Sequence, residues 1–192
     1  MSEYIQSLID GFKSGEPSFL IPQIIGFIAM LSGFISYQCK TRKGILTVQA
    51  AGSVLWTTQF LLLNSPTGAI LNVLAILRNI VYSFKGKYKW VSSLLVPIIT
   101  SGVFVVASLI TYEGPISLLP MVGMIFSSVA LYITNEKYIR LFSLGVCPCW
   151  LIYDWQCGSV AGTLTETFNL ISILIAIFRY DILKKYKEEK AQ

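Results

Sequence analysis

Residues 91–111 read VSSLLVPIITSGVFVVASLIT and contain no charged side chain. A helix needs about 20 mostly apolar residues to cross the hydrocarbon core of a bilayer, and this stretch is long enough. A continuous apolar run favours a helix over a barrel strand, because barrel strands alternate and a helix satisfies its own backbone hydrogen bonds. The stretch therefore predicts a membrane-spanning helix in an all-α membrane protein.

The rest of the sequence extends this pattern. Of 192 residues, 54% are hydrophobic and 13% are charged, a balance that ordinary water-soluble domains do not show. Seven apolar runs approach spanning length, the sixth being short: residues 19–36, 45–63, 67–84, 91–111, 116–134, 141–157 and 162–180. We therefore predict seven transmembrane helices in contact with the lipid bilayer.

The first 17 residues contain three acidic residues and one lysine, the reverse of the basic start of a cleavable signal sequence, so none is expected. Apolar residues recur there at helical spacing, at Ile5, Leu8, Ile9 and Phe12. This segment is either a short amphipathic helix in the membrane interface or a frayed tail.

Basic residues mark alternate connections between the predicted helices. They are Lys40, Arg42 and Lys43, then Lys85, Lys87 and Lys89, then Lys137 and Arg140, and finally Lys184, Lys185, Lys187 and Lys190. Because basic loops resist translocation, the pattern predicts an N-terminus outside and a C-terminus in the cytoplasm. The net charge of +5 follows from this topology, and nucleic-acid binding is not expected.

Catalytic and metal chemistry find little support in the sequence. Histidine is absent, and no Gly-rich phosphate loop or activated nucleophile is evident. Cys147-Pro148-Cys149 lies in an apolar run, where small packing residues are a commoner explanation than a redox pair. We expect no enzyme activity, cofactor or metal site.

Residues 20–84 align with residues 118–182, which predicts an internal repeat, although any two apolar triplets align passably. The aligned pairs are Gly26 with Gly123, Lys40 with Lys137, Lys43 with Arg140, Trp56 with Trp150, Ser65 with Ser159, Gly68 with Gly162 and, after a three-residue insertion, Asn72 with Asn169. Because three spans is an odd number, two parallel three-helix repeats require a linker helix between them. Repeats of this kind place a substrate site on the axis between the two halves. The predicted segments are an interfacial segment (1–17), a first repeat (18–86), a linker helix (90–112), a second repeat (115–182) and a basic cytoplasmic tail (183–192).

Three stretches resemble the YgjV-type bacterial inner membrane proteins: Pro22-Gln23-Ile24-Ile25-Gly26, the loop Gln38 to Lys43, and the segment Asn72 to Arg78. More distantly, the chain resembles the SWEET-type sugar facilitators and the nicotinamide riboside carriers. The resemblance implies a multi-pass protein of the inner membrane. In SWEET-type facilitators, residues of the second and third helix of each half line the substrate pocket, which implies this role for Trp56, Asn72, Trp150 and Asn169. It also implies hinges at Pro22 and Pro120, although neither helix has a second proline further along.

The chemistry of these residues suits a small polar ring compound. A tryptophan face offers apolar contact to a ring, while a carboxamide both donates and accepts hydrogen bonds. Gln59 and Tyr153 follow the two tryptophans by three residues and are second-tier lining candidates, and Gln23, Ser53 and Ser172 are weaker ones. The alternative is that these residues serve helix packing.

Arg78, Asp154 and Glu166 are charged residues placed inside the predicted helices. Arg78 is expected to extend to the cytoplasmic surface, with binding of an anionic solute group or pairing with an interior polar group as the alternatives. Asp154 and Glu166 are expected to be solvated acids at the outer interface. Without an ionisable pair at midplane, the sequence favours a facilitator of a small, largely neutral polar solute, such as a sugar, nucleoside or vitamin. A receptor or assembly scaffold that uses the basic tail is the alternative, and a homo-oligomer is left open.

Overall fold

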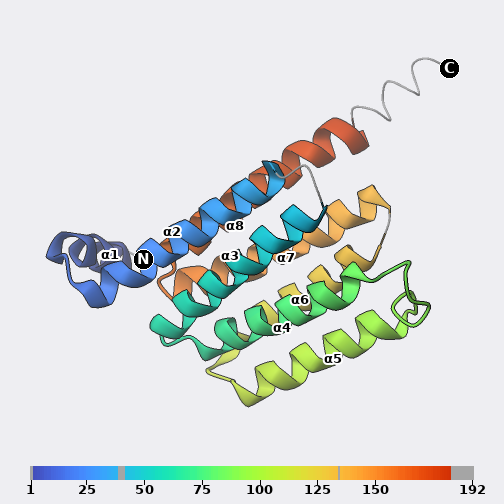
Figure 1. The fold of residues 1–192 in the computed structure, drawn as a ribbon. Coiled ribbons are helices and arrows are strands. Elements are labelled where there is room, and N and C mark those ends of the chain that lie inside the picture. The colour runs from blue at the N-terminus through green and yellow to red at the C-terminus, as the bar shows by residue number, and fades with distance from the viewer. Residues whose placement is uncertain (1, 39–41, 134, 183–192) are drawn as a thin grey trace.

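The computed structural model describes residues 2–38, 42–133 and 135–182, which form a bundle of helices with one further helix at the N-terminus (Figure 1). The α-helices are α1 (Ser2–Ser14), α2 (Pro17–Gln38), α3 (Arg42–Leu62), α4 (Pro66–Ser83), α5 (Leu95–Ile110), α6 (Leu119–Tyr132), α7 (Glu136–Gln156) and α8 (Val160–Ala176). A 3-10 helix, η1 (Pro115–Leu118), leads into α6, and α8 continues as a π-helical segment, η2 (Ile177–Ile182). The prediction of an all-α fold is confirmed.

Several described helices have the length and apolar character of membrane spans. Pro17–Ile35, Pro115–Tyr132 and Val160–Ile182 are long and apolar enough to cross a membrane, and Leu95–Ile110 is apolar but shorter. The remaining helices, α3, α4 and α7, are 21, 18 and 21 residues long but carry polar and charged side chains that lower their hydropathy. Of those side chains, Gln59, Arg78 and Asp154 are buried in the bundle.

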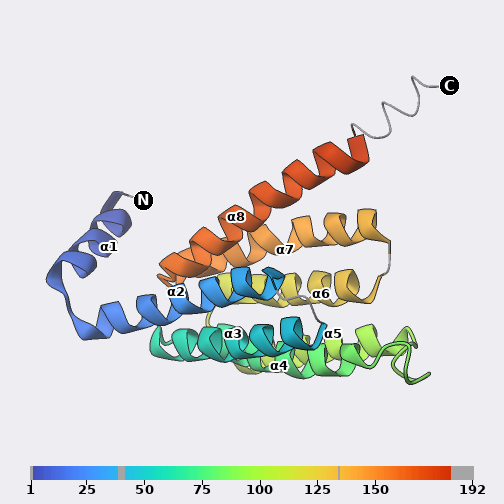
Figure 2. The ribbon, with the colours of Figure 1, turned by 45° about the horizontal axis from the view of Figure 1, so that its top comes forward.

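Six helices pack in a closed ring. In ring order they are α2, α3, α4, α6, α7 and α8, and α8 returns to contact α2. The seventh, α5, lies at the edge of the bundle and packs on both α4 and α6 (Figure 1). The end of α8 and η2 diverges from α2 in Figure 2, while η2 keeps contacts with α7. The helices α2, α3 and α4 come from the first half of the chain, and α6, α7 and α8 come from the second half. Both halves therefore border the interior of the ring.

The N-terminal segment is a helix in the structure, not a frayed tail. Its apolar residues Ile5, Ile9 and Phe12 are exposed, as on an amphipathic helix without a covering partner. Phe12 packs edge to face against Phe19 of α2, with ring centroids 5.0 Å apart. This contact fixes the corner between α1 and α2.

The α3–α4 and α7–α8 turns have the same backbone hydrogen bonds. The Ser65 N–H donates to the Phe60 carbonyl at 2.8 Å, and the Ser159 N–H donates to the Asp154 carbonyl at 2.9 Å. Each serine stands at the N-cap of the following helix. The residue before each serine has a positive φ, 52° at Asn64 and 73° at Gly158, where a left-handed conformation reverses the chain.

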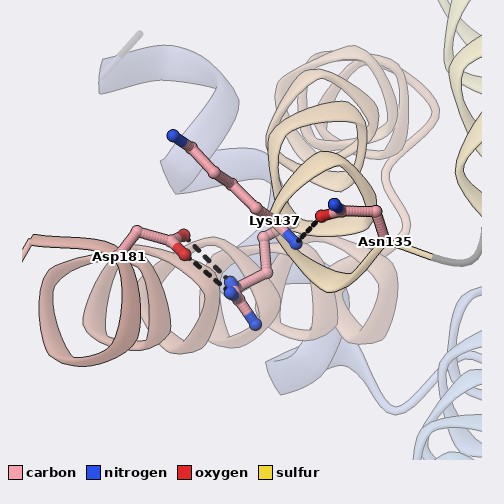
Figure 3. Close-up of polar contacts among 4 residues, drawn as sticks. Asn135, Lys137 and Asp181 are labelled. Atoms are coloured by element: carbon pink, nitrogen blue, oxygen red, sulfur yellow. Dashed lines mark hydrogen bonds and ion pairs between the residues drawn. The ribbon is translucent and has the colours of Figure 1, made fainter. Parts of the chain in front are cut away.

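The start of α7 corrects the short sixth run predicted from residue 141. The helix begins at Glu136 because the Asn135 side chain caps it, accepting a hydrogen bond from the Lys137 N–H at 3.0 Å (Figure 3). One turn further, Arg140 donates two hydrogen bonds to Asp181 of η2, at 2.7 and 3.1 Å. Figure 3 shows the Asp181 carboxylate receiving both contacts across the space between the two helices. Polar residues therefore extend α7 beyond its apolar run.

Candidate functional site

A cavity of about 240 Å³, here the central cavity, lies inside the ring of helices. Residues of α3, α4, α6, α7 and α8 line it, so both halves of the chain contribute. Its volume falls below the range of 300–1,000 Å³ that is typical of pockets for drug-sized ligands. The central cavity therefore suits a small solute.

Aromatic side chains form one part of the wall. Trp56 and Phe60 of α3 and Trp150 of α7 all line the cavity. The Phe60 ring is fully buried, with its centroid 6.5 Å from Trp56 and 6.0 Å from Trp150. This continuous aromatic surface joins the two halves of the chain.

Arg78 of α4 forms a second part of the wall, and the prediction that it extends to the cytoplasmic surface is wrong. Its residue exposure is 6%. The guanidinium donates to the hydroxyls of Ser127 and Ser128 of α6, both at 3.2 Å, and to the Asn79 side-chain oxygen at 3.1 and 3.2 Å. It also lies 5.5 Å from the centroid of the Phe104 ring of α5. Arg78 pairs with neutral interior groups, one of the predicted alternatives.

Carboxyl groups form a third part of the wall. Asp154 of α7 is 3% exposed, so the prediction of a solvated acid at the outer interface is wrong for this residue. Its Oδ1 atom has no hydrogen-bond partner among the described residues. Glu166 of α8 is half-buried and lines the same cavity. Gly162 makes room for Asp154, because a Cβ there would lie 2.5 Å from the Asp154 carboxyl carbon.

The two predicted asparagines lie in different cavities. Asn72 lines the central cavity and donates to the Gly68 carbonyl of its own helix at 2.9 Å. Asn169 lines a second cavity of about 890 Å³, here the lateral cavity, with residues of α2, α6, α7 and α8. Its amide lies 3.5 Å from Glu166 Oε1. Glu166 and Ser127 line both cavities, which therefore adjoin.

The second-tier candidates, Gln59 and Tyr153, are both buried. Neither is among the residues that line the central cavity. The Tyr153 hydroxyl accepts a hydrogen bond from the Gly68 N–H at 2.8 Å, which joins α7 to the first turn of α4. Tyr153 also lines a third cavity of about 380 Å³, here the end cavity, between the 63–65 turn and residues 113–117.

The predicted hinges occupy different positions in their helices. Pro22 lies inside α2, whereas Pro120 is the second residue of α6, where a missing N–H costs no intrahelical bond. Both prolines are fully buried.

Sequence reasoning missed Phe60, Asn79 and Ser127 as cavity residues. Asn79 is adjacent to Arg78, and a carboxamide next to an arginine within an apolar run is a signal that could have been used. Ser127 is recognisable only once α6 is placed against α4.

Comparison with known proteins now places the chain. A family model described as "Bacterial inner membrane protein", Imp-YgjV, matches residues 20–184. The chain belongs to this family. The inner membrane protein YgjV of Escherichia coli K12 is 23% identical to it over 168 residues, which cover 88% of each chain. No solved structure matches. Family membership confirms the YgjV-type resemblance and the inner membrane, while none of these matches supports the SWEET-type link.

Proposed function

We propose that this protein is a facilitator that passes a small polar solute across the bacterial inner membrane through the central cavity. The observation that carries the proposal is a cavity inside a ring of helices, lined by an arginine, two carboxyl groups, two asparagines and two tryptophans. Ionisable groups inside a membrane protein are costly and usually mark a path for a solute or ion.

The proposed topology has seven spans, α2 to α8, with the N-terminus outside and the C-terminus in the cytoplasm. The matching α3–α4 and α7–α8 turns support a duplication of three helices joined by α5. The turns both border the end cavity and thus lie at one end of the bundle. In this topology that end faces outside, and the basic connections face the cytoplasm.

The arrangement of cavities supports alternating access. The lateral cavity adjoins the central cavity along α6, α7 and α8. Towards the end cavity, the path is closed by the Tyr153–Gly68 hydrogen bond and by Phe60, whose ring centroid lies 5.8 Å from that of Tyr153. Rocking of one three-helix half against the other would break these contacts and open the opposite side.

Uptake into proteoliposomes tests the proposal. The purified full chain is reconstituted and supplied with labelled sugars, nucleosides, vitamins and amino acids. Ala75 is buried and lines the central cavity, so Ala75→Phe should fill it and abolish uptake. Ala51 is exposed on α3, and Ala51→Phe is the matched control. No saturable uptake of any solute would contradict transport, and equal uptake by both variants would contradict the central cavity as its route.

The receptor or scaffold alternative depends on the basic tail, and residues 183–192 lie outside the described residues. If the chain binds partners through residues 184–192 and shows no uptake, it is a receptor or an assembly scaffold instead.

A further inference from the structure

We infer that the solute of the central cavity is a small zwitterion, whose anionic group binds Arg78 and whose cationic group binds between the tryptophans and the carboxylates of Asp154 and Glu166. This inference rests on the proposed transport function and names its substrate class.

Arg78 supplies the anion-binding end. No described carboxylate forms an ion pair with it, and its contacts are with neutral groups: two serines, an asparagine and a thioether. A guanidinium has five N–H donors, and these contacts leave one N–H of Nη2 without a described acceptor. Burying a charge without a counter-ion is costly. A carboxylate or similar anion that enters the cavity would supply the missing charge and accept this hydrogen bond.

Asp154 and Glu166 supply the cation-binding end. Asp154 is buried and lines the central cavity, and its buried Oδ1 atom accepts no hydrogen bond from a described residue. An ammonium group could donate to this atom. Trp56 and Trp150 line the same cavity and strengthen the case, because aromatic faces attract organic cations. A wall of carboxylates and aromatic rings is therefore suited to a cation.

The anion-binding and cation-binding groups lie at different depths along the bundle. Trp56, Trp150 and Glu166 each lie six residues from the helix end at the 63–65 and 157–159 turns, which is about 9 Å along a helix axis. Arg78 lies twelve residues from the start of α4, about 18 Å from the same end. The anionic group therefore binds deeper than the cationic group. A solute with both charges, separated by a short carbon chain, matches this order.

A single neutral solute would leave both kinds of charge unpaired in the cavity. An anion alone would satisfy Arg78 and would be repelled by the two carboxylates. The two opposite charges therefore belong to one solute molecule. The experiment below distinguishes such a zwitterion from an anion that binds together with an inorganic cation.

The test measures thermal stabilisation of the purified full chain by glycine, 4-aminobutyrate, 6-aminohexanoate and 4-(trimethylammonio)butyrate, with butyrate, butylamine and glucose as singly charged and neutral probes. At least one zwitterion should stabilise the protein at lower concentration than any other probe. Stabilisation by none of the zwitterions, or by butyrate only when sodium is present, would overturn the inference.

Charge-removing variants assign the two ends. Arg78→Gln should weaken zwitterion binding by about 30-fold or more, the effect of truncating one member of a buried charged pair, and should leave butylamine binding unchanged. Asp154→Asn should weaken zwitterion binding and leave any binding of butyrate unchanged. Arg179→Gln and Asp10→Asn remove the same residue types at exposed positions away from the cavity and should have no effect. Equal zwitterion affinity in Arg78→Gln and wild type would reject the site, whether or not other variants fold.

Uptake measurements distinguish a failure of the zwitterion inference from a failure of the proposed transport function. Zwitterion binding without uptake would leave the site assigned and would contradict transport. Saturable uptake of a sugar that Arg78→Gln does not change would support transport and would contradict the zwitterion.

Discussion

Gln23 of α2 is hydrogen-bonded to both sides of the α7–α8 turn. Its Nε2 donates to the Gly158 carbonyl at 2.8 Å, and its Oε1 accepts from the Val160 N–H at 3.1 Å. The side chain is 1% exposed. Gln23 therefore joins the first helix of the ring to the last and completes the start of α8, whose first N–H groups lack intrahelical acceptors.

Replacing Gln23 should destabilise the ring. Gln23→Leu keeps most of the side-chain volume but leaves the part-buried Gly158 carbonyl and Val160 N–H without this partner, a loss of about 1–3 kcal/mol. Thermal unfolding in detergent measures this. Gln156→Leu is the control, because Gln156 is exposed at the end of α7. Equal unfolding temperatures for Gln23→Leu and wild type would show that water replaces both bonds.

Gly26 is required by its neighbour on α3. A Cβ at Gly26 would lie 2.2 Å from Gln59 Nε2, and Gln59 is fully buried. Gly26→Ala should therefore lower stability by about 1–3 kcal/mol, as overpacking does. Gly33→Ala on the same helix is the control, because nothing lies within 4 Å of its Cβ position.

The cause of this loss can be assigned with a second substitution. Gln59→Ala removes the obstructing amide, so Gly26→Ala should cost little in that background. The double-mutant cycle measures the coupling between the two positions. Additive losses would mean that Gly26 is required for its backbone and not for Gln59.

The Arg140–Asp181 pair connects α7 to η2, yet its contribution to stability should be small. Both side chains are partly exposed, at 20% and 13%, and the pair is bidentate. Partly exposed pairs contribute little to stability, and salt weakens them. Arg140→Gln and Asp181→Asn should each shift the unfolding temperature slightly, and the shift should shrink as salt is added. A large shift that salt does not reduce would show that the pair is effectively buried.

The α3–α4 and α7–α8 turns show which aligned pairs occupy equivalent positions. Ser65 aligns with Ser159 and Gly68 with Gly162, and the structure gives each pair equivalent places beside matching turns. The alignment then inserted three residues to match Asn72 with Asn169. Both α4 and α8 are continuous α-helices there, and an inserted three residues would turn the face by about 300°. Counting from the turns places Glu166, not Asn169, at the position of Asn72.

Arg78 and Asp154 show what the sequence could not reveal. Both lie near helix positions from which a side chain could extend to water, and hydropathy alone favours that outcome. Their burial depends on contacts distant in sequence: Ser127 and Ser128 of α6 for Arg78, and the close approach at Gly162 of α8 for Asp154. Helix periodicity identifies each helix but not its rotation against partners, so the apolar runs were predictable and these contacts were not.

The Tyr153 hydroxyl gives a direct test of closure towards the end cavity. Tyr153→Phe keeps the ring against Phe60 but removes the acceptor for the Gly68 N–H, at a cost of about 1 kcal/mol in the closed state. If this contact closes the path, the variant should be slightly less stable and should take up solute faster when opening limits the rate. Tyr112→Phe is the control, because Tyr112 is exposed near the same end. Uptake reduced as strongly as in Ala75→Phe would mean instead that the hydroxyl contacts the solute directly.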